Sequence, residues 1–148
     1  MDKFNTMGAR PVERIYPISS NFGDIRHEIT LDLDLKNILH KGIDFKCPEG
    51  TPCKAYLDGF IQIAHDNQDG LGQRIWLYCD LPHSQKAIRA CYAHLQRFEV
   101  KVGDHVKINS IIGYSGNTGK TTGPHLHFET RYLPEDIPYQ AQFYTQEV

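Results

Sequence analysis

Two histidines separated by one residue, His125 and His127, lie in the segment Gly123-Pro-His-Leu-His-Phe-Glu129. The composition of this segment is typical of a strand, and a strand alternates its faces, so both side chains point to the same side of the chain. Two imidazoles on one side are suited to holding a metal ion and to acid–base chemistry beside it. The pattern alone leaves open which histidine binds and which one acts.

A second cluster, His40-Lys-Gly-Ile-Asp44, precedes this pair in the sequence. Gly42 and the β-branched residue after it disfavour a helix, so we predict a strand in which His40, Gly42 and Asp44 share one face. Without a side chain, Gly42 would leave room for an ion between the two flanking ligands. His40, Asp44 and one of His125 or His127 would give two imidazoles and one carboxylate, a set typical of catalytic zinc with its fourth position open to water.

A further histidine, His94, lies in Tyr92-Ala-His-Leu95 on a predicted strand. Such a histidine is most often a partly buried structural residue, but beside an ion it becomes a candidate for holding the water or the oxyanion of the transition state. The chain contains no H-E-x-x-H motif, so no glutamate of that motif is available as the base.

The composition indicates one globular domain. The chain has 148 residues, of which 40% are hydrophobic and 23% charged, with a net charge of −2. No basic run predicts nucleic-acid binding, no apolar stretch predicts membrane insertion, and no feature indicates an obligatory protein partner. We expect a single domain over residues 1–148, with its core at about 15–133 and a C-terminal tail, 134–148, packed on it.

Short runs rich in Ile, Val, Tyr and Phe, separated by Gly, Pro, Asp and Asn, predict a mostly β fold with a compact antiparallel sheet and few short helices. Two short helical turns are expected, at Asp34–Leu39 and Leu95–Phe98, and the alternating segment Ile29–Leu35 suggests an edge strand or surface ribbon. The predicted strands are Ile15–Pro17, Ile43–Lys46, Pro52–Ala55, Gly59–His65, Gln73–Cys79, Cys91–Leu95, Ile111–Ser115 and His125–Glu129.

The four cysteines, Cys47, Cys53, Cys79 and Cys91, form no CxxC pair, which argues against a cysteine zinc site. Buried free thiols are the favoured interpretation, and a disulfide between Cys79 and Cys91 across a hairpin is the alternative. The first twenty residues carry charges throughout, so we expect no secretory signal peptide.

Taken in order, the motifs resemble those of the LytM/lysostaphin-type zinc metallopeptidases, which cut peptidoglycan peptides. The resemblance covers about residues 15–130. Its motifs are Ser20-Asn-Phe-Gly23, His40-x-Gly-x-Asp44, Tyr92-Ala-His-Leu95, Val102-Gly-Asp-His-Val106, Gly113-x-Ser-Gly-Asn-Thr-Gly119 and Gly123-Pro-His-Leu-His-Phe-Glu129.

The resemblance implies zinc ligands at His40, Asp44 and His127, with water as the fourth ligand. It makes His94 and His125 the unligated catalytic pair, one acting as base toward the water and the other stabilising the oxyanion, without deciding between them. It also implies a lipoyl-barrel-related sheet with an open groove for an extended peptide.

Four residues are expected to line this groove: Asn21, Arg26, Asn117 and Thr118. The turn that contains Asn117 and Thr118 would form one wall. Arg26 lies one position later than the arginine that the family commonly has after its aromatic residue and glycine.

The implied function is zinc-dependent hydrolysis of peptide cross-links in peptidoglycan. A single domain in which we expect neither a leader nor a wall-binding module suggests a phage-type cell-wall lysin, and a host-encoded enzyme whose leader was removed is the alternative. We expect such a lysin to be made in the cytoplasm and to reach the wall or periplasm on release at lysis, or to be carried on a virion. One alternative is a non-catalytic family member that binds and activates another wall hydrolase. A second, suggested by Val100–Val106, is a biotinyl or lipoyl carrier domain, but the chain has no Lys-Met pair to modify.

Overall fold

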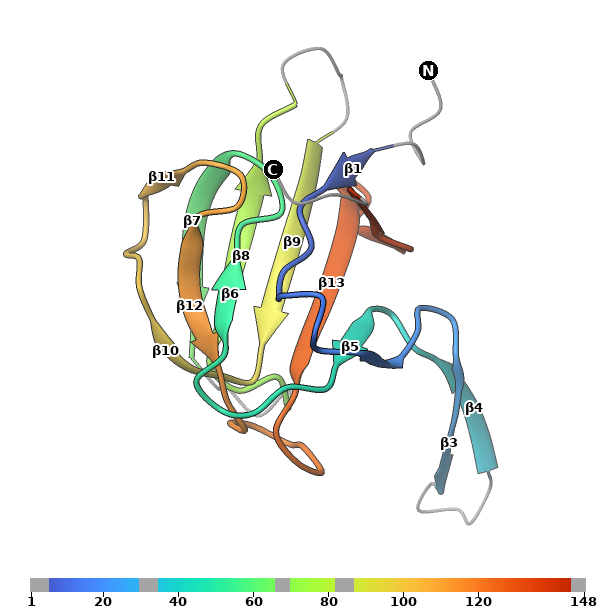
Figure 1. Ribbon diagram of the computed structural model, residues 1–148. Helices are drawn as coiled ribbons and strands as arrows, with labels where there is room; N and C mark the ends of the chain where they lie inside the picture. The colour runs from blue at the N-terminus through green and yellow to red at the C-terminus, as the bar shows by residue number, and fades with distance from the viewer. Residues whose placement is uncertain (1–5, 30–34, 66–69, 82–86, 145–148) are drawn as a thin grey trace.

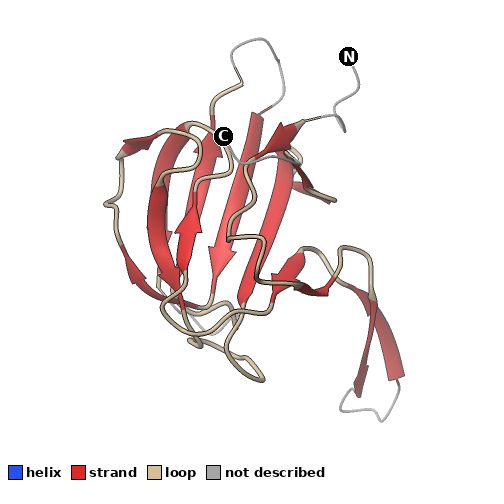
Figure 2. Ribbon diagram, in the orientation of Figure 1, coloured by secondary structure: helices blue, strands red, loops and turns tan. Residues whose placement is uncertain are grey.

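Two facing β-sheets make up the body of the protein (Figures 1 and 2). The structure, a computed structural model, describes residues 6–29, 35–65, 70–81 and 87–144, with only the backbone described for 25–29 and 35–38. All regular elements in these ranges are strands, and none is a helix that could span a membrane.

The larger sheet runs in the order β11-β7-β8-β9-β13-β5-β2 and is antiparallel, with β14 also paired to β13. In sheet order, its strands are His105–Val106 (β11), Gly59–Ala64 (β7), Arg74–Cys79 (β8), Ala87–Ala93 (β9), Leu126–Leu133 (β13), Ile43–Phe45 (β5), Ile18–Ser20 (β2) and the side strand Ile137–Tyr139 (β14).

The smaller sheet has the order β10-β12-β6, and two ribbons complete the fold. One ribbon joins the two ends of the described chain, and the other, β3–β4, stands away from both sheets in Figure 1. The bounds are Leu95–Phe98 (β10), Ile111–Ser115 (β12), Pro52–Lys54 (β6), Met7–Gly8 (β1), Gln142–Phe143 (β15), Ile25–Ile29 (β3) and Leu35–Leu39 (β4).

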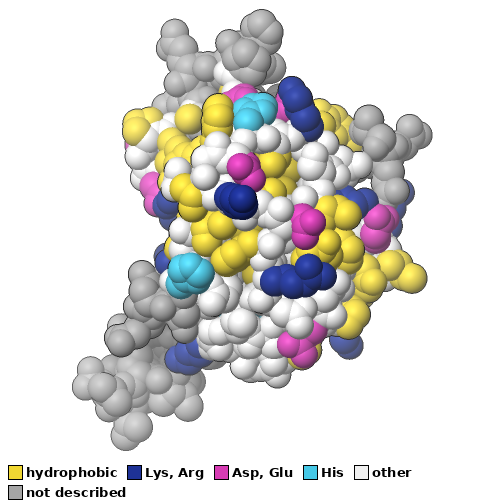
Figure 3. Space-filling model, turned by 90° about the vertical axis from the view of Figure 1, so that its left-hand side faces the viewer, with side chains coloured by type: hydrophobic (Ala, Val, Ile, Leu, Met, Phe, Trp, Pro, Cys, Tyr) yellow, Lys and Arg dark blue, Asp and Glu magenta, His cyan; other side chains and the backbone are white. Residues whose placement is uncertain are grey.

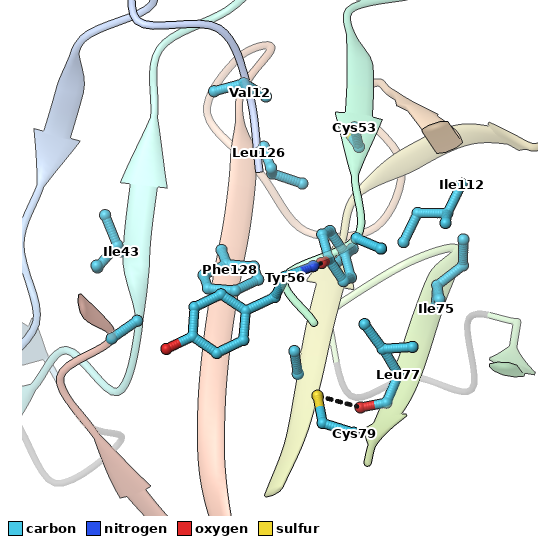
Figure 4. Close-up of a cluster of buried hydrophobic side chains, with 14 of the residues drawn as sticks. Val12, Ile43, Cys53, Tyr56, Ile75, Leu77, Cys79, Ile112, Leu126 and Phe128 are labelled. Carbon is cyan, nitrogen blue, oxygen red and sulfur yellow. Dashed lines mark hydrogen bonds between the residues drawn. The ribbon is translucent and has the colours of Figure 1, made fainter. Parts of the chain in front are cut away.

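The hydrophobic core fills the space between the sheets (Figure 4). Alternation on β7 buries Ile61 while Phe60 and Gln62 face outward, and this period of two is what the sequence pattern predicts for a sheet with one covered face. Removing this apolar surface from water is the main favourable term in folding such a domain.

One buried hydroxyl links the two sheets. Tyr92 on β9 is fully buried, and its Oη accepts a hydrogen bond from the backbone N–H of Tyr56 (2.8 Å) and donates one to the carbonyl of Lys54 (2.9 Å). Lys54 ends β6, so this side chain connects the larger sheet to the smaller one.

Figure 3 shows the side of the molecule that carries β7, β11 and β12, where hydrophobic side chains gather over the middle of the surface. The exposed large hydrophobic side chains on these strands are Phe60 and Ile111. Charged side chains interrupt the apolar area, which is therefore not a continuous hydrophobic face.

Two expected helical turns are wrong. Leu95–Phe98 pairs with β12, and Leu35–Leu39 pairs with β3, so hydrogen bonding to a distant strand outweighs local preference in both. The strand expected at Ile15–Pro17 begins instead at Ile18, and the strand expected across His40–Asp44 begins only at Ile43. The mostly β, antiparallel fold itself is confirmed.

The C-terminal segment takes part in pairing, since β14 adds to β13 and β15 pairs with β1. All four cysteines are free and buried. Cys79 pairs across β8 and β9 with Ile88, and Cys91 pairs with Trp76, so the alternative of a Cys79–Cys91 disulfide is wrong because these two residues are not opposite each other.

Replacing the buried hydroxyl tests its role in joining the sheets. Tyr92→Phe leaves the Tyr56 N–H and the Lys54 carbonyl without their partner, so we expect the free energy of unfolding to fall by about 1–3 kcal/mol in urea titrations. Tyr144→Phe, at an exposed tyrosine, is the matched control and should change it by less than about 0.5 kcal/mol. Equal effects of the two substitutions would contradict this role.

Candidate metal centre

The pairing of β13 with β5 places His127 directly opposite Asp44. His40, four residues before Asp44, follows β4 and reaches the same point from a loop. One potential ligand atom from each of these three residues lies within 4.8 Å of the other two. The nearest approaches are 3.3 Å from His40 Nε2 to His127 Nδ1, 3.4 Å from His40 Nε2 to Asp44 Oδ1, and 2.8 Å from His127 Nδ1 to Asp44 Oδ1.

These spacings fit a tetrahedral metal site. Zinc bonds of about 2.0–2.1 Å place two ligand atoms about 3.3 Å apart. Both distances from His40 Nε2 agree with this value, and the shorter third distance reflects a direct hydrogen bond between His127 and Asp44. A bound ion would replace the proton in that bond, and two imidazoles with one carboxylate form a donor set suited to zinc.

In each candidate ligand histidine, the ring nitrogen that points away from the metal position, here called the outer nitrogen, is held by an oxygen atom. His40 Nδ1 lies 3.0 Å from both the Asn21 carbonyl and Ser20 Oγ, and His127 Nε2 lies 2.7 Å from Glu129 Oε1. A carbonyl and an ionised carboxylate only accept hydrogen bonds, so each outer nitrogen donates its proton. Such partners fix the tautomer and turn the other nitrogen toward the metal position.

The electrostatics of the cluster keep its carboxylates ionised. Burial opposes the charge on Asp44, but hydrogen bonds from His127 and His40 outweigh it and hold the pKa of this carboxyl far below its ordinary range. Burial also opposes a charge on His127, whereas its bonds to Asp44 and Glu129 raise its pKa to about 9. The pKa of Glu129 is lowered, because its bond from His127 outweighs the effect of burial.

Two further histidines adjoin this cluster. The rings of His94 and His125 lie 4.8 Å apart between centroids, and His125 Nε2 is 3.9 Å from Asp44 Oδ1. Each ring donates its Nδ1 proton to a backbone carbonyl, His94 to Thr118 at 2.7 Å and His125 to Gly123 at 2.9 Å. In both rings, Nε2 is therefore the nitrogen available to accept a proton.

His94 lies at the junction between the two sheets, between the end of β9 and the start of β10. Its backbone has a positive φ of 62°, so it is not part of the continuous strand that the sequence suggests. Burial lowers the pKa of His94 by more than its bond to the Thr118 carbonyl raises it. Burial therefore favours the neutral form of this imidazole, the form that a general base requires.

Of the four expected groove residues, Thr118 has the clearest structural role. Its carbonyl holds His94, while its hydroxyl accepts from the Gln73 N–H (3.1 Å) and donates to the Leu95 carbonyl (2.8 Å). Asn21 is exposed and contributes its carbonyl to His40, and Asn117 is also exposed. The side chain of Arg26 lies outside the described part of the structure.

Gly42 has a different role from the expected one. A Cβ added there would lie 2.4 Å from the Phe128 carbonyl, 2.8 Å from Glu129 Cγ and 3.0 Å from His127 Cε1. The missing side chain therefore makes room for the backbone and side chains of β13. The expectation that it leaves space for an ion is wrong, because β13 occupies that space.

Glu129 is the site residue that the sequence reasoning missed. It lies two residues after His127 on the same strand, so the period of two that pairs the histidines also puts this carboxylate on their face. That spacing was the available signal. Ser20, at the end of β2, and the loop carbonyls that hold the rings of His40, His94 and His125 carried no comparable signal.

Comparison with known proteins identifies the family of this chain. The family model "Peptidase family M23" matches residues 38–139, a range that includes all five clustered residues. Lysostaphin of Staphylococcus simulans is 42% identical over 97 residues, covering 66% of this chain and 19% of that protein. The peptidoglycan DD-endopeptidase ShyC of Vibrio cholerae is 40% identical over 113 residues, covering 76% of this chain and 24% of that protein.

Solved structures give the same result. A zinc containing peptidase from Vibrio cholerae aligns with a TM-score of 0.76 and 28% identity over 96% of this chain and 41% of that one. The catalytic domain of lysostaphin from S. simulans aligns with a TM-score of 0.69 and 34% identity over 85% and 89% of the two chains. The chain spans less than a third of the length of its curated relatives, 19% of lysostaphin and 24% of ShyC. From its fold, its sequence and the arrangement of its histidines, the chain belongs to peptidase family M23, the family of the LytM/lysostaphin-type metallopeptidases.

Proposed function

We propose that this protein is a zinc-dependent endopeptidase that hydrolyses peptide cross-links of bacterial peptidoglycan. The observation that carries the proposal is the division of labour among the clustered side chains. Three of them, His40, Asp44 and His127, turn ligand atoms toward one point at spacings that suit zinc. The other two, His94 and His125, keep Nε2 available beside that point.

A zinc ion bound by the three ligands would polarise the scissile carbonyl and lower the pKa of water from about 16 to about 7. One of His94 and His125 accepts the proton of the attacking water at Nε2. The other, when protonated, donates a hydrogen bond to the oxyanion of the tetrahedral intermediate. The carbonyls of Thr118 and Gly123 hold both rings in orientation, so this alignment exists before substrate binds.

Exposure suggests where the substrate approaches. The side chain of His125 is 18% exposed, whereas those of His127, Asp44 and His40 are 10%, 12% and 3% exposed. A peptide would therefore meet the site from the His125 side. We propose that Asn21, Arg26, Asn117 and Thr118 border its path.

Peptidoglycan as substrate is supported by the names of relatives, which include a glycyl-glycine endopeptidase and a peptidoglycan DD-endopeptidase. The alternative of a non-catalytic activator is disfavoured, because such a protein does not need all three candidate metal ligands and both candidate catalytic histidines, and this chain has all five.

We further propose that the protein is a phage-type lysin that acts on the wall or periplasm. Adding the protein to cell walls and measuring the release of wall fragments would test the action on the wall.

Paired substitutions distinguish ligand from catalyst. His127→Ala removes a ligand atom, so we expect the purified protein to lose bound zinc and activity together. His125→Ala should retain stoichiometric zinc while turnover falls by about 10²–10⁴-fold. Metal content by elemental mass spectrometry and cleavage of labelled peptidoglycan provide the two measurements.

His105→Ala is the matched control for these substitutions, because His105 is an exposed histidine on β11 that bonds Asp80 and lies outside the cluster. It should change neither zinc content nor turnover. Normal zinc and turnover in both site variants would contradict the assignment.

Metal removal tests the activity and identifies the bond. Protein incubated with peptidoglycans of different cross-link chemistry should release fragments that mass analysis assigns to one type of peptide bond. A chelator should abolish the release, and added zinc should restore it, because the ligand set has no other electrophile to replace the ion. Absence of chelator-sensitive cleavage on every wall type would exclude the endopeptidase function.

A further inference from the structure

A chain of alternating charges runs from His127 along the outer face of the larger sheet. Glu129 Oε1 accepts from His127 Nε2 (2.7 Å), and its other oxygen, Oε2, accepts from Arg131 Nε (3.1 Å). Arg131 Nη1 donates to the carbonyl of Asp136 (3.0 Å) and approaches its carboxylate at 3.4 Å. Arg89 closes the chain with two bonds to the same carboxylate, at 2.9 and 2.8 Å.

Strand pairing explains why these residues meet. His127, Glu129 and Arg131 share one face of β13, and Arg89 lies opposite Arg131 on β9. Asp136 lies in the turn that joins β13 to β14, and the Arg89 guanidinium stacks on Trp76 at 3.8 Å from the ring centroid. A guanidinium stacked on an indole and bonded twice to a carboxylate has little freedom to move.

From Asp136 through Arg131 to Glu129, burial increases toward the metal centre. The side chain of Asp136 is 38% exposed, those of Arg89 and Arg131 are 21% and 17%, and that of Glu129 is 8%. Burying charges such as Glu129 and Arg131 contributes little net stability, since loss of hydration offsets their attraction. Their arrangement is better explained by what it does to His127.

We propose that Glu129, Arg131 and Asp136, anchored by Arg89, are positioning residues that hold the His127 ring with Nδ1 turned toward Asp44 and thereby set the affinity of the site for zinc. This inference rests on the proposed metal site. Glu129 fixes the tautomer of His127, Arg131 fixes the carboxylate of Glu129, and Asp136 fixes Arg131. Each of these contacts restricts the rotation of one side chain, so metal binding does not have to restrict it.

The test is zinc affinity, measured by competition with a chromophoric chelator. Glu129→Gln and Arg131→Met should each raise the dissociation constant by about 10- to 100-fold, the usual effect of losing an outer partner of a metal ligand. Asp136→Asn, at a more exposed turn where folding is least affected, should raise it by a smaller factor. In NMR spectra of the zinc-loaded protein, the Nε2-bound proton of His127 should exchange with water faster in all three variants than in the unmodified protein.

Arg97→Met is the matched control, because Arg97 also stacks on an aromatic ring, Tyr114, and approaches a carboxylate, Glu99, but has no link to His127. It should leave zinc affinity unchanged. Unfolding in the presence of chelator separately measures any loss of stability. If the site variants lost only stability and bound zinc as tightly as the unmodified protein, the positioning role would be overturned. If the unmodified protein bound no zinc, the metal site itself would fail instead.

Discussion

The site depends on the register of one strand. β13 is paired on one side with β5 and on the other with β9, so its position along both neighbours is fixed by backbone hydrogen bonds. A shift of one residue would turn His127 and Glu129 into the core and bring Phe128 to the outer face. Phe128 packs against Tyr56 and Tyr92, so the hydrophobic core resists that shift. Packing on the inner face thus holds the chemistry on the outer face.

The second requirement is that four imidazoles each keep one nitrogen bonded to an oxygen. The acceptors come from separate parts of the chain: the Asn21 carbonyl for His40, Glu129 for His127, and two backbone carbonyls for His94 and His125. Three of the four acceptors are backbone atoms in loops, so the conformation of these loops contributes as much to the site as the identity of their side chains. Thr118 shows how a loop is held, since its hydroxyl bonds Gln73, just before β8 of the larger sheet, and Leu95 on β10 of the smaller sheet.

The sequence allowed prediction of the features that depend on short spacing. The mostly β fold followed from strand-like periods of two, and the order of the motifs, through the resemblance, pointed to the five residues that the structure brings together. Features that depend on distant pairing were not predictable. Leu95–Phe98 forms a strand because β12 lies beside it, and Gly42 is required because β13 passes close to it. The positive φ of His94 results from the chain changing sheets, which no local pattern indicates.

The backbone of His94 has a consequence for how this protein can change. In the left-handed region, glycine is the residue with the least steric conflict, and histidine pays a cost of up to about 1–2 kcal/mol there. Under the proposed mechanism, stability alone would favour glycine at this junction, whereas turnover would require the imidazole. A substitution by glycine would then relieve the backbone and keep the fold but remove the proposed catalytic group.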